Sequence, residues 1–237
     1  MTSEKKQKPL FRHELKFSIT EAEKHVITSK IKDILAFDPN AKNGGYTIRS
    51  LYFDDRWNRA YEEKMSGIAM REKYRIRIYD YKDNVIKLER KTKQGSYIYK
   101  QAVNLTRDEF EMIINGKYRF LEKREENLCK EFYVECMVNG MRPKVIVDYE
   151  REPYILNAGE VRITFDMDVR AGMLNYDIFD KKLPTISCLE PGRLVMEVKY
   201  TEFLPQVIRN ILPPEQSEYV AISKYVLCYD KRYGILM

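Results

Sequence analysis

The chain has 237 residues, of which 44% are hydrophobic and 33% charged, and its formal net charge is +6. The apolar fraction suffices for a folded core and charges of both signs are interspersed, so the composition excludes a largely disordered protein. No apolar run is long enough to cross a membrane, the first ten residues lack the apolar segment of a secretory signal, and the four cysteines form no disulfide framework. We therefore expect a reduced, cytoplasmic protein.

The first half of the chain predicts strands separated by short helices. Residues 10–18 alternate apolar and polar side chains, as a half-buried strand does. Thr20 and Glu23 have the spacing of a capping box, which predicts a helix from that point. Residues 56–66 fit either a helix or an irregular segment. Further strands are expected at 46–53, 69–81, 85–93 and 96–105, with turns at 43–45, 83–84 and 94–95.

The second half begins with another capping box. Thr106 and Glu109 predict a short helix that Gly116 ends, and residues 119–139 also have a helical pattern. Neither an internal repeat nor a linker is apparent, so we expect a disordered tail at 1–8 and a single domain at 9–237. The remaining elements are strands at 144–151, 161–166 and 193–200 and a last helix at 217–231.

Several predicted strands carry charge on one face and apolar side chains on the other. One explanation is an antiparallel sheet with one face in water, which is common. The repetition over at least five strands favours a second explanation, in which the sheet closes and the charged faces line its lumen. The predicted fold class is therefore α+β, an antiparallel β-barrel with helices packed outside. The charged faces consist of Arg12, Glu14 and Lys16; Arg71, Lys73, Arg75 and Arg77; Lys87, Glu89 and Lys91; Arg162, Thr164 and Asp166; and Arg193, Glu197 and Lys199.

A lumen of this kind predicts an anionic ligand and a hard metal ion. Like charges 5 Å apart repel by about 3 kcal/mol even at an effective dielectric constant near 20, and a chain of phosphates would relieve this repulsion. Arginine adds bidentate hydrogen bonds to phosphate oxygens. The carboxylates of Glu14, Glu89 and Glu197 would hold Mn²⁺ or Mg²⁺ together with phosphate oxygens. Only two histidines are present, which argues against zinc or copper.

The order and spacing of eight segments support a family resemblance. They are RHELKF at 12–17, RSLYFD at 49–54, YRIRIY at 74–79, KLERKT at 87–92, YERE at 149–152, RITFD at 162–166, MEVKY at 196–200 and SKY at 223–225. In these segments the chain resembles the VTC domain, the polyphosphate polymerase module of the triphosphate tunnel metalloenzymes in the CYTH-like superfamily. The resemblance runs from about residue 9 to 233. One departure is Arg12, which stands where wider tunnel enzymes often begin an E-x-E-x-K strand.

The resemblance implies a β-tunnel in which the γ-phosphoryl group of ATP is transferred to a growing polyphosphate chain with Mn²⁺ or Mg²⁺ bound. It implies catalytic roles for Lys224, Ser223, Arg75 and Arg77, with the first two at the tunnel mouth. Glu197 would be the principal metal ligand. Phosphate contacts are expected from Lys16, Lys87, Lys91, Tyr149, Arg151, Arg162 and Lys199.

Two other functions stay open at this point. A tunnel triphosphatase or polyphosphatase would release orthophosphate, and a non-catalytic module would bind polyphosphate or a nucleotide without turnover. Nucleic acid is not an expected partner, because the charged faces lack base-stacking aromatics and no helix has clustered basic residues. A membrane-associated partner is compatible with the sequence. Lys224 is expected to be exposed, so that Lys224→Ala would impair turnover more than folding.

Overall fold

The computed structural model describes residues 13–41, 44–95, 97–201, 203–213 and 222–234. Its strands are β1 (His13–Thr20), β2 (Ala36–Phe37), β3 (Tyr46–Asp54), β4 (Met70–Tyr79), β5 (Lys82–Gln94), β6 (Tyr97–Leu105), β7 (Arg142–Leu156), β8 (Val161–Gly172), β9 (Thr185–Ser187) and β10 (Arg193–Tyr200). Its α-helices are α1 (Glu21–Ile31), α2 (Arg59–Met65), α3 (Arg107–Ile114), α4 (Arg119–Glu122), α5 (Asn127–Val138), α6 (Gln206–Arg209) and α7 (Lys224–Tyr233).

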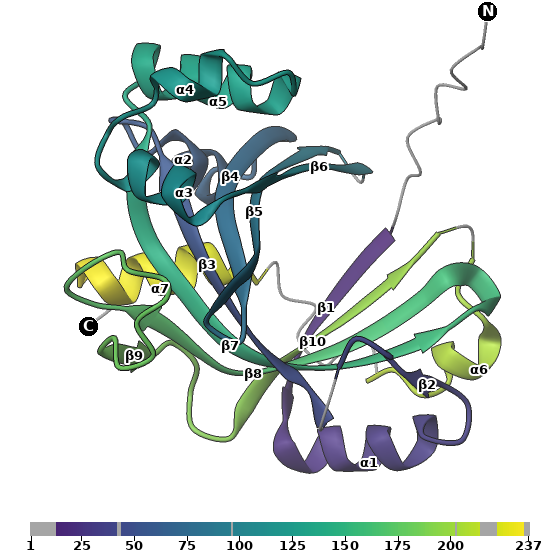
Figure 1. Ribbon diagram of the computed structural model, residues 1–237. Helices are drawn as coiled ribbons and strands as arrows, with labels where there is room; N and C mark the ends of the chain where they lie inside the picture. Colours follow the sequence, from purple (N-terminus) through teal and green to yellow (C-terminus); the bar gives the residue numbers. More distant parts are fainter. Residues whose placement is uncertain (1–12, 42–43, 96, 202, 214–221, 235–237) are drawn as a thin grey trace, which may run out of the picture.

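All these strands belong to one curved antiparallel sheet (Figure 1). The strand order is β1-β10-β8-β7-β3-β4-β5-β6, while β2 pairs with β7 and β9 with β8. The predicted α+β class and antiparallel tunnel architecture are confirmed. The sheet differs from the predicted closed barrel in one respect. Within the described ranges no strand pairing joins its two edge strands, β1 and β6. Side chains approach across the gap instead, since Lys91 Nζ of β5 lies 2.8 Å from Glu14 Oε2 of β1.

Helices cover the apolar face of this sheet in two groups (Figure 1). Helices α3, α4 and α5 pack on β4 and β5 in a cluster that includes Phe132 and Ile76. Helices α1 and α6 pack on β1, β8 and β10 in a second cluster that includes Ile31 and Phe165. Burial of the apolar face against helices leaves the opposite, charged face of the sheet to line its concave side.

Helix α7 lies on the charged side of the sheet. Its Tyr225 and Tyr229 pack with Val145, Val147 and Tyr149, which share one face of β7 with Arg151. The helix begins at Lys224, with Ser223 as its N-cap. The predicted helix started at 217, but residues 214–221 lie outside the described part of the chain, as do Arg12 and the predicted tail.

Most predicted elements are present, and the differences concern their ends. Both capping boxes are confirmed, and the strand at 193–200 has the predicted bounds. The helical pattern at 119–139 divides into α4 and α5. Strands β7 and β8 extend well beyond the predicted 144–151 and 161–166, because they pair with each other along a long hairpin. The short elements β2, β9 and α6 had no recognised sequence signal.

The turn between β4 and β5 was predicted three residues too late. Asp80 and Tyr81 form it, not Asp83 and Asn84, and both have positive φ, 51° and 59°. A two-residue hairpin turn of this twist needs positive φ at both central positions. Asp80 Oδ1 accepts a hydrogen bond from the backbone N–H of Thr47 at 3.0 Å, which supports this position of the turn.

Asp54, the last residue of β3, holds helices α2 and α7 in place. Its buried carboxylate accepts hydrogen bonds from the backbone N–H groups of Ala60 and Tyr61. It also accepts one from the hydroxyl group of Tyr225 at 2.6 Å. The start of α7 is thereby fixed relative to the sheet.

We expect Tyr225→Phe to lower the free energy of unfolding by roughly 1.5–3 kcal/mol, the range for a hydrogen bond to a charged group. The ring is retained, so the loss isolates the bond to buried Asp54. Urea denaturation measures the change. Tyr99→Phe, at an exposed position of β6, is the control and should leave stability unchanged; equal stabilities of the two variants would contradict the role given to Asp54.

Candidate functional site

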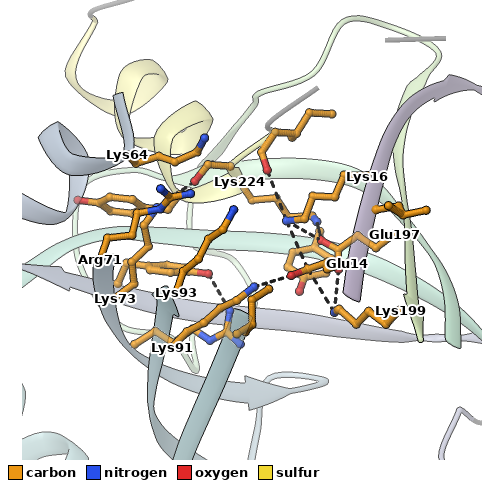
Figure 2. Close-up of a pocket in the computed structure, with 18 of the residues that line it drawn as sticks. Glu14, Lys16, Lys64, Arg71, Lys73, Lys91, Lys93, Glu197, Lys199 and Lys224 are labelled. Atoms are coloured by element: carbon orange, nitrogen blue, oxygen red, sulfur yellow. Dashed lines mark hydrogen bonds and ion pairs between the residues drawn. The ribbon is translucent and has the colours of Figure 1, made fainter. Parts of the chain in front are cut away.

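A cavity of about 450 Å³ opens on the concave side of the sheet. Two carboxylates line it, Glu14 and Glu197, together with Tyr52, Tyr149 and Ser223. Figure 2 shows the basic side chains converging from β1, β4, β5, β10, α2 and α7. Among the described residues, eleven lysines and arginines line the cavity: Lys16, Lys64, Arg71, Lys73, Arg75, Arg77, Lys91, Lys93, Arg151, Lys199 and Lys224.

Strand alternation explains why these charges meet. Every second residue of a strand points to the same side of a sheet. On β4 this places Arg71, Lys73, Arg75 and Arg77 toward the cavity, while Tyr74, with Ile76 and Ile78, enters the core. Curvature of the sheet then brings the basic faces of β4 and β5 opposite β1 and β10. The cavity is therefore strongly cationic although the whole chain carries only +6.

Glu197 is the centre of the ion-pair network in the cavity. Its Oε1 lies 2.8 Å from Lys224 Nζ and 3.3 Å from Lys16 Nζ, and its Oε2 lies 3.0 Å from Lys199 Nζ. Burial alone would raise the pKa of this carboxyl. The attraction of Lys16, Lys199 and the neighbouring cations is larger in sum and holds the pKa well below its usual range. Glu197 is therefore ionised at neutral pH.

Lys224 is buried, contrary to the prediction that it is exposed on its helix. Its Nζ lies 2.5 Å from Asp166 Oδ2 and 2.8 Å from Glu197 Oε1. Asp166 is itself fully buried and also binds Arg151 at 2.6 Å. Burial lowers the pKa of Lys224, but the two carboxylates raise it further, and the net pKa lies well above its ordinary value. Lys224→Ala is accordingly expected to affect folding as well as turnover.

Ser223 brings the start of α7 to the cavity. Its Oγ accepts a hydrogen bond from the backbone N–H of Val226, as an N-cap does, and another from Lys73 Nζ at 3.1 Å. Lys73 also lies 4.8 Å from the ring centroid of Tyr225. Within the described ranges, Lys73 makes no ion pair with a carboxylate.

Two cavity lysines have a pKa below the usual value for lysine. Burial, together with Lys64, Arg71 and other cations, lowers the pKa of Lys73 to about 7. Burial likewise lowers the pKa of Lys91 to about 8; the attraction of Glu14 opposes this shift only in part. Burial is the largest cause of both shifts, and the neighbouring cations lower both pKa values further. A bound polyanion would supply negative charge and raise both pKa values.

We therefore expect anion binding to take up protons above pH 7. Below pH 7 Lys73 is protonated with or without a ligand, and the affinity is independent of this group. Above pH 7 the empty protein loses the proton while the complex keeps it, so the affinity for tripolyphosphate falls as the pH rises. Calorimetry at pH 6.5 and 8.5, in two buffers that differ in ionisation enthalpy, measures the proton uptake.

Lys73→Arg is the matched control for this measurement, because arginine keeps its proton at all these pH values. The variant should bind tripolyphosphate with a smaller pH dependence than the original chain. An identical pH dependence in both proteins would exclude Lys73 as the titrating group.

A family model matches nearly the whole chain. The model is the VTC domain, and it covers residues 11–233. The chain belongs to the VTC domain family.

The chain shares its fold with a solved structure at low sequence identity. A Hippeastrum protein, described as a candidate adenylyl cyclase with a dominant triphosphatase activity, has a TM-score of 0.54 and 11% identity over 94% of this chain and 96% of its own. A candidate adenylate cyclase of Bacillus halodurans has a TM-score of 0.48 and 9% identity over 86% and 95%. One of Vibrio parahaemolyticus has 0.45 and 12% over 86% and 83%. No curated protein matches the chain.

No helix in the described part of the chain is long and apolar enough to cross a membrane.

In this VTC domain, most of the predicted site residues line the same cavity. They are Glu14, Lys16, Arg75, Arg77, Lys91, Tyr149, Arg151, Glu197, Lys199, Ser223 and Lys224.

Three predicted residues do not line it. Arg162 pairs with Asp38 at 2.8 Å and donates a hydrogen bond to the hydroxyl group of Tyr46. Lys87 stands beside Arg77 on the neighbouring strand. Glu89 is buried between arginines. A phosphate contact for Lys87 and Arg162 stays a prediction.

Other cavity residues had no assigned role. Lys73 and Arg71 were recognised on the charged face of their strand, and Lys93 continues the alternation of Lys87, Glu89 and Lys91. Period-two spacing was thus a sufficient signal for these three. Lys64 comes from α2 and Tyr52 from β3, and neither has such a pattern. The hydroxyl group of Tyr52 accepts a hydrogen bond from Arg75 at 2.8 Å.

The cavity offers few carboxylates to a divalent metal ion. The described residues contain no group of three or more His, Cys, Asp and Glu side chains that would hold a metal alone. Glu14 and Glu197 nevertheless face one cavity and share Lys16 and Lys199 as partners. One or two carboxylates are what Mg²⁺ uses when phosphates supply the other ligands. The residues therefore fit a metal ion that arrives with its phosphate ligand.

Proposed function

We propose that this VTC domain is a metal-dependent polyphosphate polymerase that transfers the γ-phosphoryl group of ATP to a growing polyphosphate chain in its basic cavity. One observation carries the proposal: eleven cationic side chains and two carboxylates line a cavity in the described structure. Such a cavity is electrostatically unfavourable when it is empty and favourable when a linear polyanion fills it.

The reaction requires little covalent chemistry from the protein. An ionised oxygen of the terminal phosphate of the acceptor attacks the γ-phosphorus of ATP, the bond from that phosphorus to the β-phosphate oxygen breaks, and ADP leaves. No proton has to be removed from the acceptor. Catalysis then depends on in-line alignment and on neutralising the transferred group.

The residues named above divide these tasks. Arg75 and Arg77 present guanidinium groups to the transferred phosphoryl group, and Ser223 with the N-terminus of α7 binds a terminal phosphate oxygen. Lys224 holds Glu197 and Asp166 in position. The remaining phosphate contacts are assigned to Lys16, Lys91, Tyr149, Arg151 and Lys199.

Glu197 and Glu14 would hold Mn²⁺ or Mg²⁺ with the phosphates. Such an ion would supply positive charge against the negative charge that develops on the transferred group. Glu197 is already ionised, so it needs no deprotonation to act as a ligand.

A triphosphatase is the second candidate, because the Hippeastrum protein of the same fold is described as having a dominant triphosphatase activity. Hydrolysis, unlike chain extension, requires a water molecule to lose a proton.

Analysis of the products separates the two activities. The protein is incubated with ATP and Mn²⁺, Mg²⁺ or EDTA, and the products are resolved by gel electrophoresis and phosphate assay. Phosphate chains with ADP support the polymerase, and orthophosphate alone supports the triphosphatase. Tight binding of polyphosphate without turnover would leave a binding module.

A further inference from the structure

Glu89 of β5 is a buried anion directly behind two cavity arginines. Its side chain is 1% exposed, and its Oε2 lies 2.7 Å from Arg75 Nε and 3.9 Å from Arg77 Nε. Lys100 of β6 binds the other carboxylate oxygen. Arg75 and Arg77 line the cavity, whereas Glu89 does not.

The position follows from strand pairing. Arg75 of β4 and Glu89 of β5 are direct partners in the antiparallel register, so the ion pair forms across neighbouring strands. Burial alone would raise the pKa of Glu89, but the attraction of Arg75, Arg77 and Lys100 outweighs it, and the net pKa lies well below the usual range. Glu89 is therefore ionised at neutral pH. It was predicted to be a metal ligand, but its carboxylate contacts Arg75, Arg77 and Lys100 instead.

Glu14 and Glu197 differ from Glu89 in one respect. Both line the cavity, so a metal ion that enters with phosphates can reach them. Glu89 reaches the cavity only through the two arginines that it binds. The negative charge of Glu89 therefore weakens the electrostatic attraction between these two arginines and an anionic ligand on their other side.

We propose that Glu89 is a built-in counter-anion that competes with substrate phosphates for Arg75 and Arg77 and so weakens the hold of the cavity on a phosphate chain. This inference rests on the proposed function. A polymerase must let its product advance after every transfer, and binding that stabilises the bound chain too strongly slows this step without helping the chemistry. Glu89 is thus an affinity-determining residue that does not itself contact substrate.

Glu89→Gln is the direct test, because it removes the charge and keeps the shape, with one accepting oxygen replaced by an amide NH2 donor. Tripolyphosphate binding is measured by calorimetry without nucleotide or metal. We expect a dissociation constant about ten-fold lower than that of the original chain, the effect of one added charge-assisted contact. Glu131→Gln is the matched control. Glu131 of α5 pairs with Arg90, the neighbour of Glu89 on β5. Its side chain is 42% exposed and does not line the cavity.

A buried charge can also be needed for folding, so a second measurement accompanies the first. Thermal unfolding with and without tripolyphosphate gives the rise in Tm that the ligand causes, even for a less stable variant. A larger rise in Glu89→Gln than in the original chain supports the inference. An equal or weaker affinity and an equal or smaller rise would overturn it and make Glu89 a purely structural partner. If the original chain does not bind tripolyphosphate, the proposed function itself fails.

Discussion

Replacing Lys224 by methionine should lower the free energy of unfolding by about 3 kcal/mol and abolish turnover. The methylene chain is kept, but Asp166 and Glu197 lose the ammonium group that lies 2.5 and 2.8 Å from them. Removing one partner of a buried ion pair leaves an uncompensated charge, which typically costs 3–5 kcal/mol. Arg151, Lys16 and Lys199 remain near these carboxylates, so we expect the lower end of that range.

Urea denaturation at pH 7 measures this loss. Lys231→Met, one residue past Asp230 on the same helix, is the control and should stay close to the original stability, since Lys231 makes no ion pair with the described carboxylates. A Lys224→Met protein with unchanged stability would show that the Asp166–Lys224–Glu197 cluster contributes nothing to the fold.

Replacing Glu197 by glutamine should separate catalysis from binding. We expect turnover of ATP to fall by at least about 100-fold, the scale of removing one group that stabilises transition-state charge. The affinity for tripolyphosphate without metal should stay the same or increase, because a negative charge leaves a cationic cavity. Glu197 contacts Lys16, Lys199 and Lys224, and each of these cations becomes more available to phosphate.

Steady-state kinetics over a range of Mn²⁺ concentrations and metal-free calorimetry test the two halves of this prediction. Glu150→Gln, an exposed carboxylate of β7, is the control for the change in net charge. Loss of tripolyphosphate affinity together with turnover would mean that Glu197 organises the phosphate site rather than the metal.

The charged face of the tunnel could be predicted because it depends on local alternation. Arg75 and Arg77 are two residues apart on one strand, and a period of two is enough to place both on the same side. The helix starts at Thr20 and Thr106 were equally local, since each capping box is contained in four residues.

The roles of the three glutamates could not be predicted in the same way. Glu14, Glu89 and Glu197 all alternate with apolar residues, yet Glu89 alone of the three is withdrawn from the cavity. The difference arises from the pairing of β4, β5 and β6, which places Arg75 and Lys100 on either side of Glu89. No pattern within one strand contains that information.

The burial of Lys224 has a similar origin. An isolated helix with Ser223 as its N-cap gives no reason to bury its first lysine. Burial follows from the packing of Tyr225 against Asp54 and of α7 against β7, which brings Lys224 to Asp166 on β8. These contacts join residues more than 50 positions apart in the chain.

The most direct test of the proposed function follows the γ-phosphoryl group itself. The protein is supplied with ATP labelled at the γ-phosphorus, an unlabelled short polyphosphate primer and Mn²⁺, and the products are separated by chain length. The proposed function predicts label in chains longer than the primer, in an amount equal to the ADP formed, and at least about 100-fold slower labelling by the Glu197→Gln variant. Label found only in orthophosphate, with the primer unchanged in length, would contradict it.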